Sequence, residues 1–101
     1  MCYFVYILYS KKLDTFYKGQ TADLNDRLNR HNAGYEKATK RGIPWILVWY
    51  VTKESRSQAT ILELKLKNLS REKIIKFILK YKDGIAGPDV ADVLIVSKSG
   101  C

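Results

Sequence analysis

The feature that most constrains the fold is an apolar run near the start of the chain. Residues Tyr3 to Tyr9 are aromatic or aliphatic at every position, which is typical of a β-strand buried on both faces. Polar residues then indicate a turn, and a second short run, Thr15 to Gln20, contains further aromatic side chains before Gly19. The two runs predict an antiparallel hairpin with a loop of about four residues.

Helical periodicity replaces this pattern after the hairpin. The stretch Thr21 to Ala33 begins with Thr21 or Asp23 as a candidate N-cap, repeats leucine four residues apart, and is followed by Gly34 as a candidate C-cap. We predict a helix there, followed by a third strand over Pro44 to Val51.

Two more helices are predicted in the second half of the chain. Ser55 and Gln58 have the spacing of a capping box, and aliphatic residues at helical spacing follow them. Ser70 begins a second pattern of this kind, which continues to Leu79. The expected fold is therefore α/β in the α+β sense: a small, mainly antiparallel three-stranded sheet with packed helices, in the order β-β-α-β-α-α.

The chain is long enough for one compact core. It has 101 residues, of which 47% are hydrophobic. We expect a single domain over residues 1–82. Residues 83–101 are expected to form a C-terminal tail or an edge strand, with Val90 to Val96 as the apolar part.

The charge of the chain suggests its partner. A formal net charge of +8 and a pI near 9.6 attract polyanions, so nucleic acid is the first partner to test. No apolar run is long enough for a membrane span. The first ten residues lack the features of a secretory signal, and Cys2 and Cys101 have the spacing of neither a metal site nor a disulfide framework. We therefore expect a cytoplasmic protein.

Two side chains on the first helix are candidates for chemistry. Arg27 and His31 are four residues apart, so they share one helix face, beside the leucine stripe and at the border with the rest of the domain. A cleft residue is expected at such a border. The structural alternative is that the stem of Arg27 packs on the core and that His31 is a helix-end histidine favoured by the helix dipole.

Three further candidates lie on the other elements. Tyr6 and Tyr17 are on the two strands of the hairpin, where tyrosine is also common for packing reasons. Glu63 interrupts an aliphatic helical run at the edge of its buried face. A carboxylate at that position requires a partner, either a metal ion or a cation of the protein such as Lys67.

Short motifs occur in a fixed order along the chain. Phe4-Val5-Tyr6 is similar to a GIY motif, and Tyr17-Lys18-Gly19 is similar to a YIG motif. Gly19 together with the following segment, Gln20 to Asn32, is similar to the signature G-x-T-x-D-L-x-x-R-L-x-x-H-N. Over about residues 3 to 80 the chain thus resembles the small stand-alone GIY-YIG proteins, which are related to the nuclease domain of the repair excinuclease.

The resemblance implies a metal-dependent endonuclease that hydrolyses phosphodiester bonds in DNA, in repair or recombination, with double-stranded or branched DNA as the partner. One divalent ion, Mg²⁺ or Mn²⁺, would be held by Glu63 and water. The catalytic residues implied are Tyr6, Tyr17, Arg27, His31 and Glu63. The residues expected to bind DNA are Lys18, Lys37, Lys40, Arg41 and Lys65.

Two alternatives remain open from the sequence. A catalytically inactive nucleic-acid-binding module of the same fold would have the same basic surface. An ordinary α/β interaction domain would use that surface to bind an acidic protein. Metal-dependent cleavage that is lost on replacing Glu63 would separate the enzyme from both.

Overall fold

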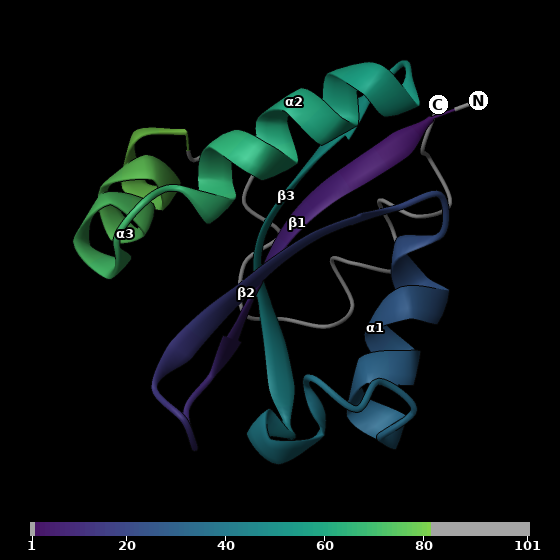
Figure 1. Cartoon of the computed structure of the whole chain (residues 1–101), viewed down its shortest axis with the longest axis vertical. Helices are drawn as coiled ribbons and strands as arrows, with labels where there is room; N and C mark the ends of the chain where they lie inside the picture. Colours follow the sequence, from purple (N-terminus) through teal and green to yellow (C-terminus); the bar gives the residue numbers. More distant parts are fainter. Residues whose placement is uncertain (1, 82–101) are drawn as a thin grey trace.

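The computed structural model describes residues 2–81, so the predictions for residues 83–101 lie outside the described part of the chain. The described residues form three strands and three longer helices in the predicted order β-β-α-β-α-α, with a short 3₁₀ helix, η1, before the third strand. Figure 1 shows how they are arranged. The elements are β1 (Tyr3–Ser10), β2 (Thr15–Thr21), α1 (Leu24–Ala33), η1 (Lys40–Gly42), β3 (Trp45–Lys53), α2 (Arg56–Lys67) and α3 (Arg71–Lys80).

The three strands form one antiparallel sheet in the order β2-β1-β3. Because β1 is central, both of its edges are hydrogen-bonded and both of its faces are covered, which explains its unbroken apolar sequence. The register places Tyr6 of β1 opposite Gly19 of β2 and Tyr50 of β3. The predicted hairpin and three-stranded antiparallel sheet are confirmed.

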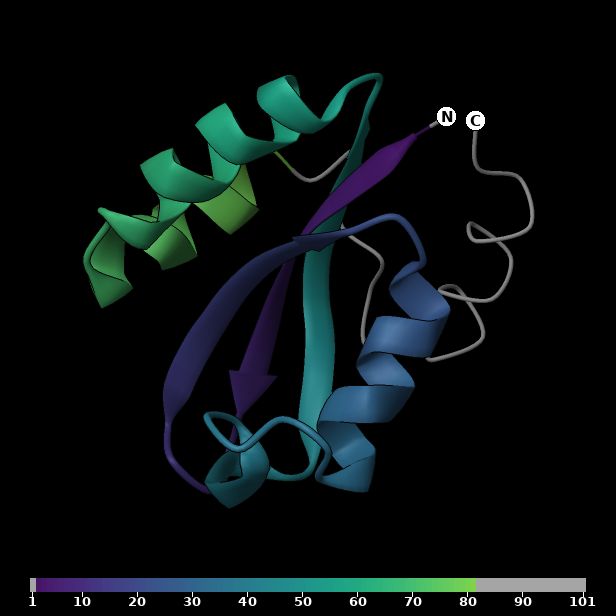
Figure 2. The ribbon, with the colours of Figure 1, turned by 45° about the vertical axis from the view of Figure 1, so that its right-hand side comes forward.

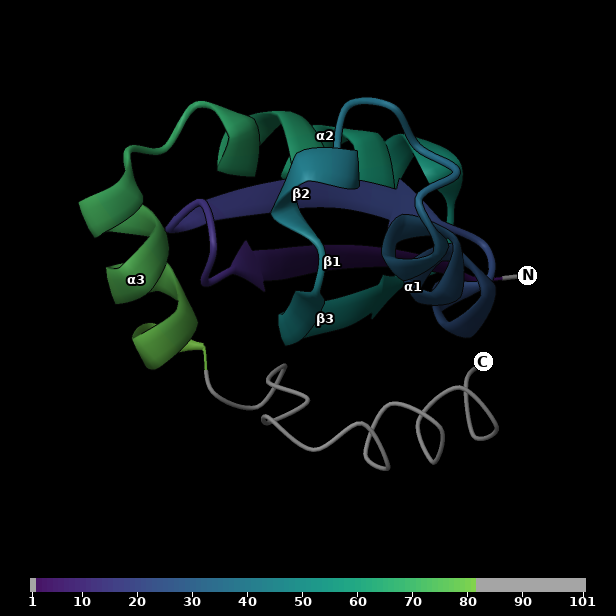
Figure 3. The same cartoon turned by 90° about the horizontal axis from the view of Figure 1, so that it is seen from below.

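Helices cover the two faces of the sheet unequally. Figure 2 shows α1 on one side of the strands and α2 with α3 on the other, and Figure 3 shows α1 and α3 at opposite ends of the view. Successive side chains of β1 point to opposite faces. One core cluster therefore combines Phe4, Tyr6 and Leu8 with leucines of α1. The other combines Val5 and Ile7 with side chains of α2 and α3.

Local capping fixes where the helices begin. Of the two N-cap candidates for α1, Asp23 is the cap: its side chain accepts a hydrogen bond from the backbone N–H of Asp26 at 3.0 Å. Thr21 is instead the last residue of β2. Gly34 ends α1 with a φ of 84°, the left-handed conformation that favours glycine. Ser55 and Ser70 cap α2 and α3, as the sequence predicts.

The connection from α1 to β3 is held by Trp45. Asn32 accepts a hydrogen bond from the backbone N–H of Trp45 at 2.6 Å and donates one to its backbone oxygen at 3.1 Å. The indole N–H of Trp45 donates to the backbone oxygen of Thr39 at 2.7 Å. These contacts fix a polar segment that has no strand or helix periodicity, and they determine where Thr39 lies.

The structure bears on two expectations from the sequence, one about the cysteines and one about membrane spans. Cys2 is disulfide-bonded, which differs from the expectation that the cysteines form no disulfide framework. The cysteines therefore give no support for a reducing compartment. Within residues 2–81, the helices are too short or too polar to cross a membrane.

Candidate active site

Tyr6 and His31 are joined by a buried hydrogen bond. The distance from Tyr6 Oη to His31 Nε2 is 3.1 Å, and each residue is only 1% exposed. On the other side of the ring, Nδ1 of His31 is 2.9 Å from the hydroxyl oxygen of Thr39. Both ring nitrogens of this histidine therefore have partners within the protein.

The hydroxyl of Thr39 indicates which ring nitrogen is protonated. It donates to the backbone oxygen of Glu36 at 3.4 Å, so it is an acceptor toward His31. Neutral His31 then donates from Nδ1 to Thr39 and keeps a lone pair at Nε2. It follows that Tyr6 donates its hydroxyl proton to His31.

Burial keeps both partners neutral. Burial raises the pKa of the Tyr6 phenol well above its usual range, and the neighbouring Tyr17 raises it further. Burial also lowers the pKa of His31 below its ordinary value of 6.5, against the opposing effect of Glu36. The pair is therefore a neutral donor and a neutral acceptor near pH 7.

Tyr17 is the more accessible of the two tyrosines. Its ring centroid lies 4.9 Å from that of His31, in an edge contact, and 6.3 Å from that of Tyr6. Unlike Tyr6 it is partly exposed. The structure thus brings both predicted tyrosines against the predicted histidine and exposes one of them to solvent.

Gly19 allows the two tyrosines to approach the edge of the sheet. A Cβ atom at this position would lie 2.6 Å from Oη of Tyr6 and 3.2 Å from Cε2 of Tyr17. The first distance is a clash with a buried ring that has little room to move. The absence of a side chain at Gly19 is therefore a packing requirement of the tyrosine pair.

Arg27 acts on the same phenol. Its guanidinium lowers the pKa of Tyr6 through its charge and through hydrogen bonding, although burial has the larger effect. Arg27 is partly exposed, one helical turn before His31 on α1. Part of the guanidinium charge is thus available to a ligand in solvent while the side chain contacts the buried pair.

Glu63 reaches this cluster from the opposite side of the sheet. It lies on α2, where Gln20 of β2 donates from Nε2 to its Oε1 at 2.9 Å and Lys67 contacts its Oε2 at 3.3 Å. The carboxylate nevertheless raises the pKa of the Tyr6 phenol, which places the two groups within electrostatic reach. The edge of the sheet at Gly19 and Gln20 is where the two faces meet.

Comparison with known proteins shows the family of the chain. The family model of the GIY-YIG catalytic domain matches residues 2–76. The chain belongs to the GIY-YIG family. A UPF0213 protein of Staphylococcus haemolyticus is 35% identical over 77 residues, which is 75% of this chain and 93% of the relative. The solution NMR structure of a UPF0213 protein from Bacillus halodurans is similar at a TM-score of 0.54 and 32% identity, over 80% of this chain and 86% of that one.

Membership of the GIY-YIG family gives the chain a nuclease-type domain, and GIY-YIG nucleases generally use divalent metal ions. Within residues 2–81 no group of three or more His, Cys, Asp or Glu side chains is arranged to hold a metal. Glu63 is nonetheless suitable as a single ligand, since Mg²⁺ retains much of its water shell. Beside it, Oε1 of Gln20 is a buried acceptor without a partner in the described residues. The donor set fits one hydrated divalent ion.

The residues predicted to bind DNA in this GIY-YIG domain lie in three places. Lys37, Lys40 and Arg41 are exposed on the connection between α1 and β3. Lys18 lies on β2, where burial and then the charge of Lys67 lower the pKa of its ammonium group. The last predicted residue is Lys65, on α2, and it belongs to a separate surface.

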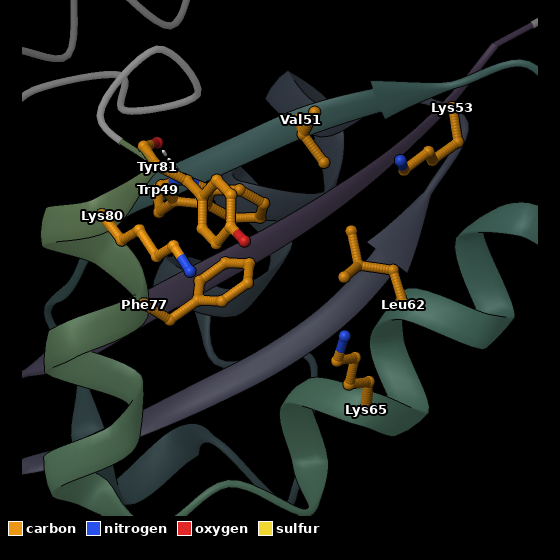
Figure 4. Close-up of a pocket in the computed structure, with 8 residues that line it drawn as sticks. All are labelled: Trp49, Val51, Lys53, Leu62, Lys65, Phe77, Lys80 and Tyr81. Carbon is orange, nitrogen blue, oxygen red and sulfur yellow. Dashed lines mark hydrogen bonds between the residues drawn. The ribbon is translucent and has the colours of Figure 1, made fainter.

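That surface is a hollow of about 370 Å³ between β3, α2 and α3 (Figure 4). Figure 4 shows aromatic rings of β3 and α3 on one side of the hollow and the side chains of α2 on the other. Its lining contains none of the predicted catalytic residues. The lining residues are Trp49, Val51, Lys53, Leu62, Lys65, Phe77, Lys80 and Tyr81.

The structure adds two polar residues to those predicted from the sequence. Thr39 holds Nδ1 of His31, and Gln20 holds Oε1 of Glu63. Thr39 lies in a segment without periodicity, so no sequence pattern indicates its role. Gln20 carries a weak signal, since it is a polar side chain on a strand that packs against α2.

Proposed function

We propose that this GIY-YIG protein is a metal-dependent endonuclease that hydrolyses phosphodiester bonds in DNA, in repair or recombination and in the cytoplasm. The observation that carries the proposal is the environment of the Tyr6 phenol. Its hydroxyl contacts His31, and its pKa responds to Tyr17, Arg27 and Glu63. The side chains that the family resemblance implies for catalysis therefore interact around one phenol.

Arg27 is proposed to bind the phosphate that is cleaved. Its planar guanidinium presents N–H donors that match two phosphate oxygens at once, which a lysine cannot do. The guanidinium is partly exposed and one helical turn from His31. A phosphate bound there would lie next to the phenols and would share the positive charge that now acts on Tyr6.

Tyr17, as a phenolate whose own proton has passed to solvent, is proposed to orient the attacking water and to accept a proton from it. It is partly exposed, whereas Tyr6 is 1% exposed and its hydroxyl proton is directed to His31. Tyr6 and His31 would hold the Tyr17 ring through their contacts with it. The water oxygen forms a bond to phosphorus, the bond from phosphorus to the leaving oxygen breaks, and that oxygen takes a proton from solvent.

Glu63 is proposed to bind the divalent ion, Mg²⁺ or Mn²⁺. When bound, such an ion neutralises negative charge on the leaving oxygen and on the phosphate. The Glu63 carboxylate has lone pairs available for the ion. Gln20 donates to one lone pair of Oε1 of Glu63, and Oε2 of Glu63 contacts Lys67, whose side chain is 50% exposed.

The exposed basic residues are proposed to bind the DNA backbone. Lys37, Lys40 and Arg41 extend from the same connection that carries Thr39, and Lys18 lies near Glu63's partner Lys67. Contacts of this kind give affinity that falls with salt and carries no base selection.

Cleavage of supercoiled plasmid, branched DNA and single-stranded DNA or RNA, with Mg²⁺ or Mn²⁺ present, tests the proposal. The native chain is expected to cleave DNA only with metal. Glu63→Gln is expected to reduce the rate about a thousandfold while DNA binding, measured by fluorescence anisotropy, stays within about twofold. Glu72→Gln, at an exposed acid on α3, is the matched control and should cleave at the native rate.

One contact favours the alternative of a DNA-binding module without turnover. The ion pair between Lys67 and Glu63, at 3.3 Å, already gives the carboxylate a partner. If the native chain binds DNA but cleaves none of the substrates with either metal, the chain is a binding module. If Glu63→Gln cleaves at the native rate, the ion is held by another group.

A further inference from the structure

Gln20 lies where the two faces of the sheet meet. It follows Gly19 on the edge strand β2, and its Nε2 is 2.9 Å from Oε1 of Glu63 and 2.9 Å from Oγ1 of Thr60. An ionised carboxylate can only accept hydrogen bonds, so the nitrogen end of the amide must face Glu63. These two contacts define the orientation of the Gln20 side chain.

The other end of this amide has no partner. Oε1 of Gln20 is buried and lacks a hydrogen-bond donor, and within residues 2–81 it is the sole buried side-chain polar atom in that condition. A buried carbonyl without a donor costs about 1–3 kcal/mol. Native structures rarely keep such an atom unless a bound group supplies the donor.

Glu63, which lies next to this carbonyl, indicates what kind of bound group would donate to it. Glu63 is mostly buried, with a side chain 14% exposed, and it carries negative charge next to the Gln20 amide. A lone water would supply a donor to Gln20, but the positive charge beside Glu63 would then come from Lys67 alone, whose side chain is 50% exposed. A hydrated divalent cation supplies both, because the ion attracts the carboxylate and the protons of its water shell point outward.

We propose that Gln20 is a positioning residue of the metal site, whose amide nitrogen holds the Glu63 carboxylate and whose carbonyl oxygen accepts a hydrogen bond from the water shell of the bound cation. The inference rests on the proposed function, which assigns the ion to Glu63. Residues that hold a metal ligand in this way typically change metal affinity about 10–100-fold when they are replaced.

Binding of Mn²⁺ to the full chain without nucleic acid tests this role, with free Mn²⁺ measured by electron paramagnetic resonance. Gln20→Leu is expected to weaken Mn²⁺ binding about tenfold or more, and Glu63→Gln should reduce it to background. Gln58→Leu removes an exposed glutamine of α2 and should leave the affinity unchanged. Circular dichroism with chelator present establishes that each variant is folded.

Gln20→Glu keeps the shape and the acceptor oxygen but removes the two N–H donors. This variant is expected to retain Mn²⁺ affinity, because the acceptor remains and negative charge is added, while the cleavage rate falls about tenfold because the Glu63 carboxylate is no longer held. If Gln20 served packing alone, Gln20→Glu would change Tm, but it would not lower the cleavage rate while leaving the Mn²⁺ affinity unchanged. If Gln20→Leu does not fold, Gln20→Glu is the test: native Mn²⁺ affinity with a lower cleavage rate supports the role of Gln20, and native affinity with a native rate overturns it.

The outcomes distinguish this inference from the proposed function. Native Mn²⁺ affinity in Gln20→Leu or in Glu63→Gln overturns the role of Gln20, even if the chain cleaves DNA. A chain that binds Mn²⁺ through Glu63 and Gln20 but cleaves no nucleic acid supports the role of Gln20 and overturns the proposed function.

Discussion

The two faces of the sheet are built from the same central strand but differ in chemistry. On the α1 face, buried polar groups are part of the core, with Tyr6, His31 and Thr39 hydrogen-bonded in a chain. On the face covered by α2 and α3, the buried core is hydrophobic, and its members are Val5, Ile7, Trp49, Ala59, Leu66 and Ile74.

This difference separates a hydrophobic core, which confers stability, from a polar core, which contains candidate catalytic groups; Glu63 lies on α2 but outside the hydrophobic cluster, at the edge of the sheet. Polar groups in a core must be fully paired, and the α1 face achieves this with defined partners for each ring nitrogen of His31. Replacements on the hydrophobic face should therefore act mainly on stability. Replacements on the α1 face should act on stability and on activity together.

The largest effect is expected from Leu66→Ala on the hydrophobic face. Leu66 is fully buried, and the cavity left by the substitution should lower the free energy of unfolding by about 2–5 kcal/mol. Leu64→Ala on the same helix is the control, because Leu64 is 55% exposed and should change stability little. Urea denaturation measures both, and equal effects would contradict the assignment of the core to this face.

The next effect is expected from Gly19→Ala at the edge of the sheet. The added methyl group would lie 2.6 Å from the hydroxyl of Tyr6, so overpacking should cost about 1–3 kcal/mol in the free energy of unfolding. Adding Tyr6→Phe removes that hydroxyl and should relieve part of the cost. Strictly additive effects in this double-mutant cycle would show that the two residues do not interact.

Tyr6→Phe alone should have a smaller effect. It leaves Nε2 of His31 buried without its donor, which should lower the free energy of unfolding by about 1–2 kcal/mol. Tyr9→Phe makes the same chemical change at an exposed hydrogen bond to Asp14 and should cost less. A larger loss in the free energy of unfolding for Tyr9→Phe than for Tyr6→Phe would contradict this prediction.

The titration of His31 is a more subtle test of the polar face. It is the single histidine of the chain, so its ring signals in an NMR titration are unambiguous. Its pKa in the folded protein should lie below the ordinary value of 6.5. The folded state then binds this proton less tightly than the unfolded state. Stability from the neutral ring is complete above about pH 6.5 and is lost as the pH falls through the lower folded-state pKa. A pKa above 6.5 would contradict a buried neutral ring.

The smallest effect on stability is expected from Lys65→Gln beside the hollow of Figure 4. The free energy of unfolding should change by less than about 0.5 kcal/mol. If Lys65 contacts a phosphate, the slope of log affinity against log salt should fall by about 1. Lys11→Gln, in the exposed turn of the hairpin, is the control. Identical slopes for both variants and the native chain would exclude Lys65 from DNA binding.

The fold could be predicted because the chain changes periodicity at the right places. The buried run of β1, the capping serines of α2 and α3, and Gly34 are local signals, and each marks an element of the structure. The start of α1 is ambiguous in the sequence, because Thr21 and Asp23 are both good caps by residue type. Strand pairing decides it, since Thr21 is paired with Phe4 on β1.

The candidate site could be predicted only in part. Helical spacing indicates that Arg27 and His31 share a face, and the interruption of an aliphatic run indicates Glu63. No spacing along the sequence indicates that Thr39 contacts His31, because the segment is held by the hydrogen bonds between Asn32 and Trp45. Contacts of this kind depend on tertiary packing and are absent from any local pattern.

The alternation of side chains along β1 makes the register of the sheet part of the chemistry. Tyr6 stands between Val5 and Ile7, whose side chains lie in the opposite core. A slip of one residue in the pairing with β2 would turn the phenol into the aliphatic layer and bring a valine or isoleucine to face His31. An insertion or deletion in the hairpin loop that shifted this pairing would therefore separate Tyr6 from His31 while leaving both residues in the sequence.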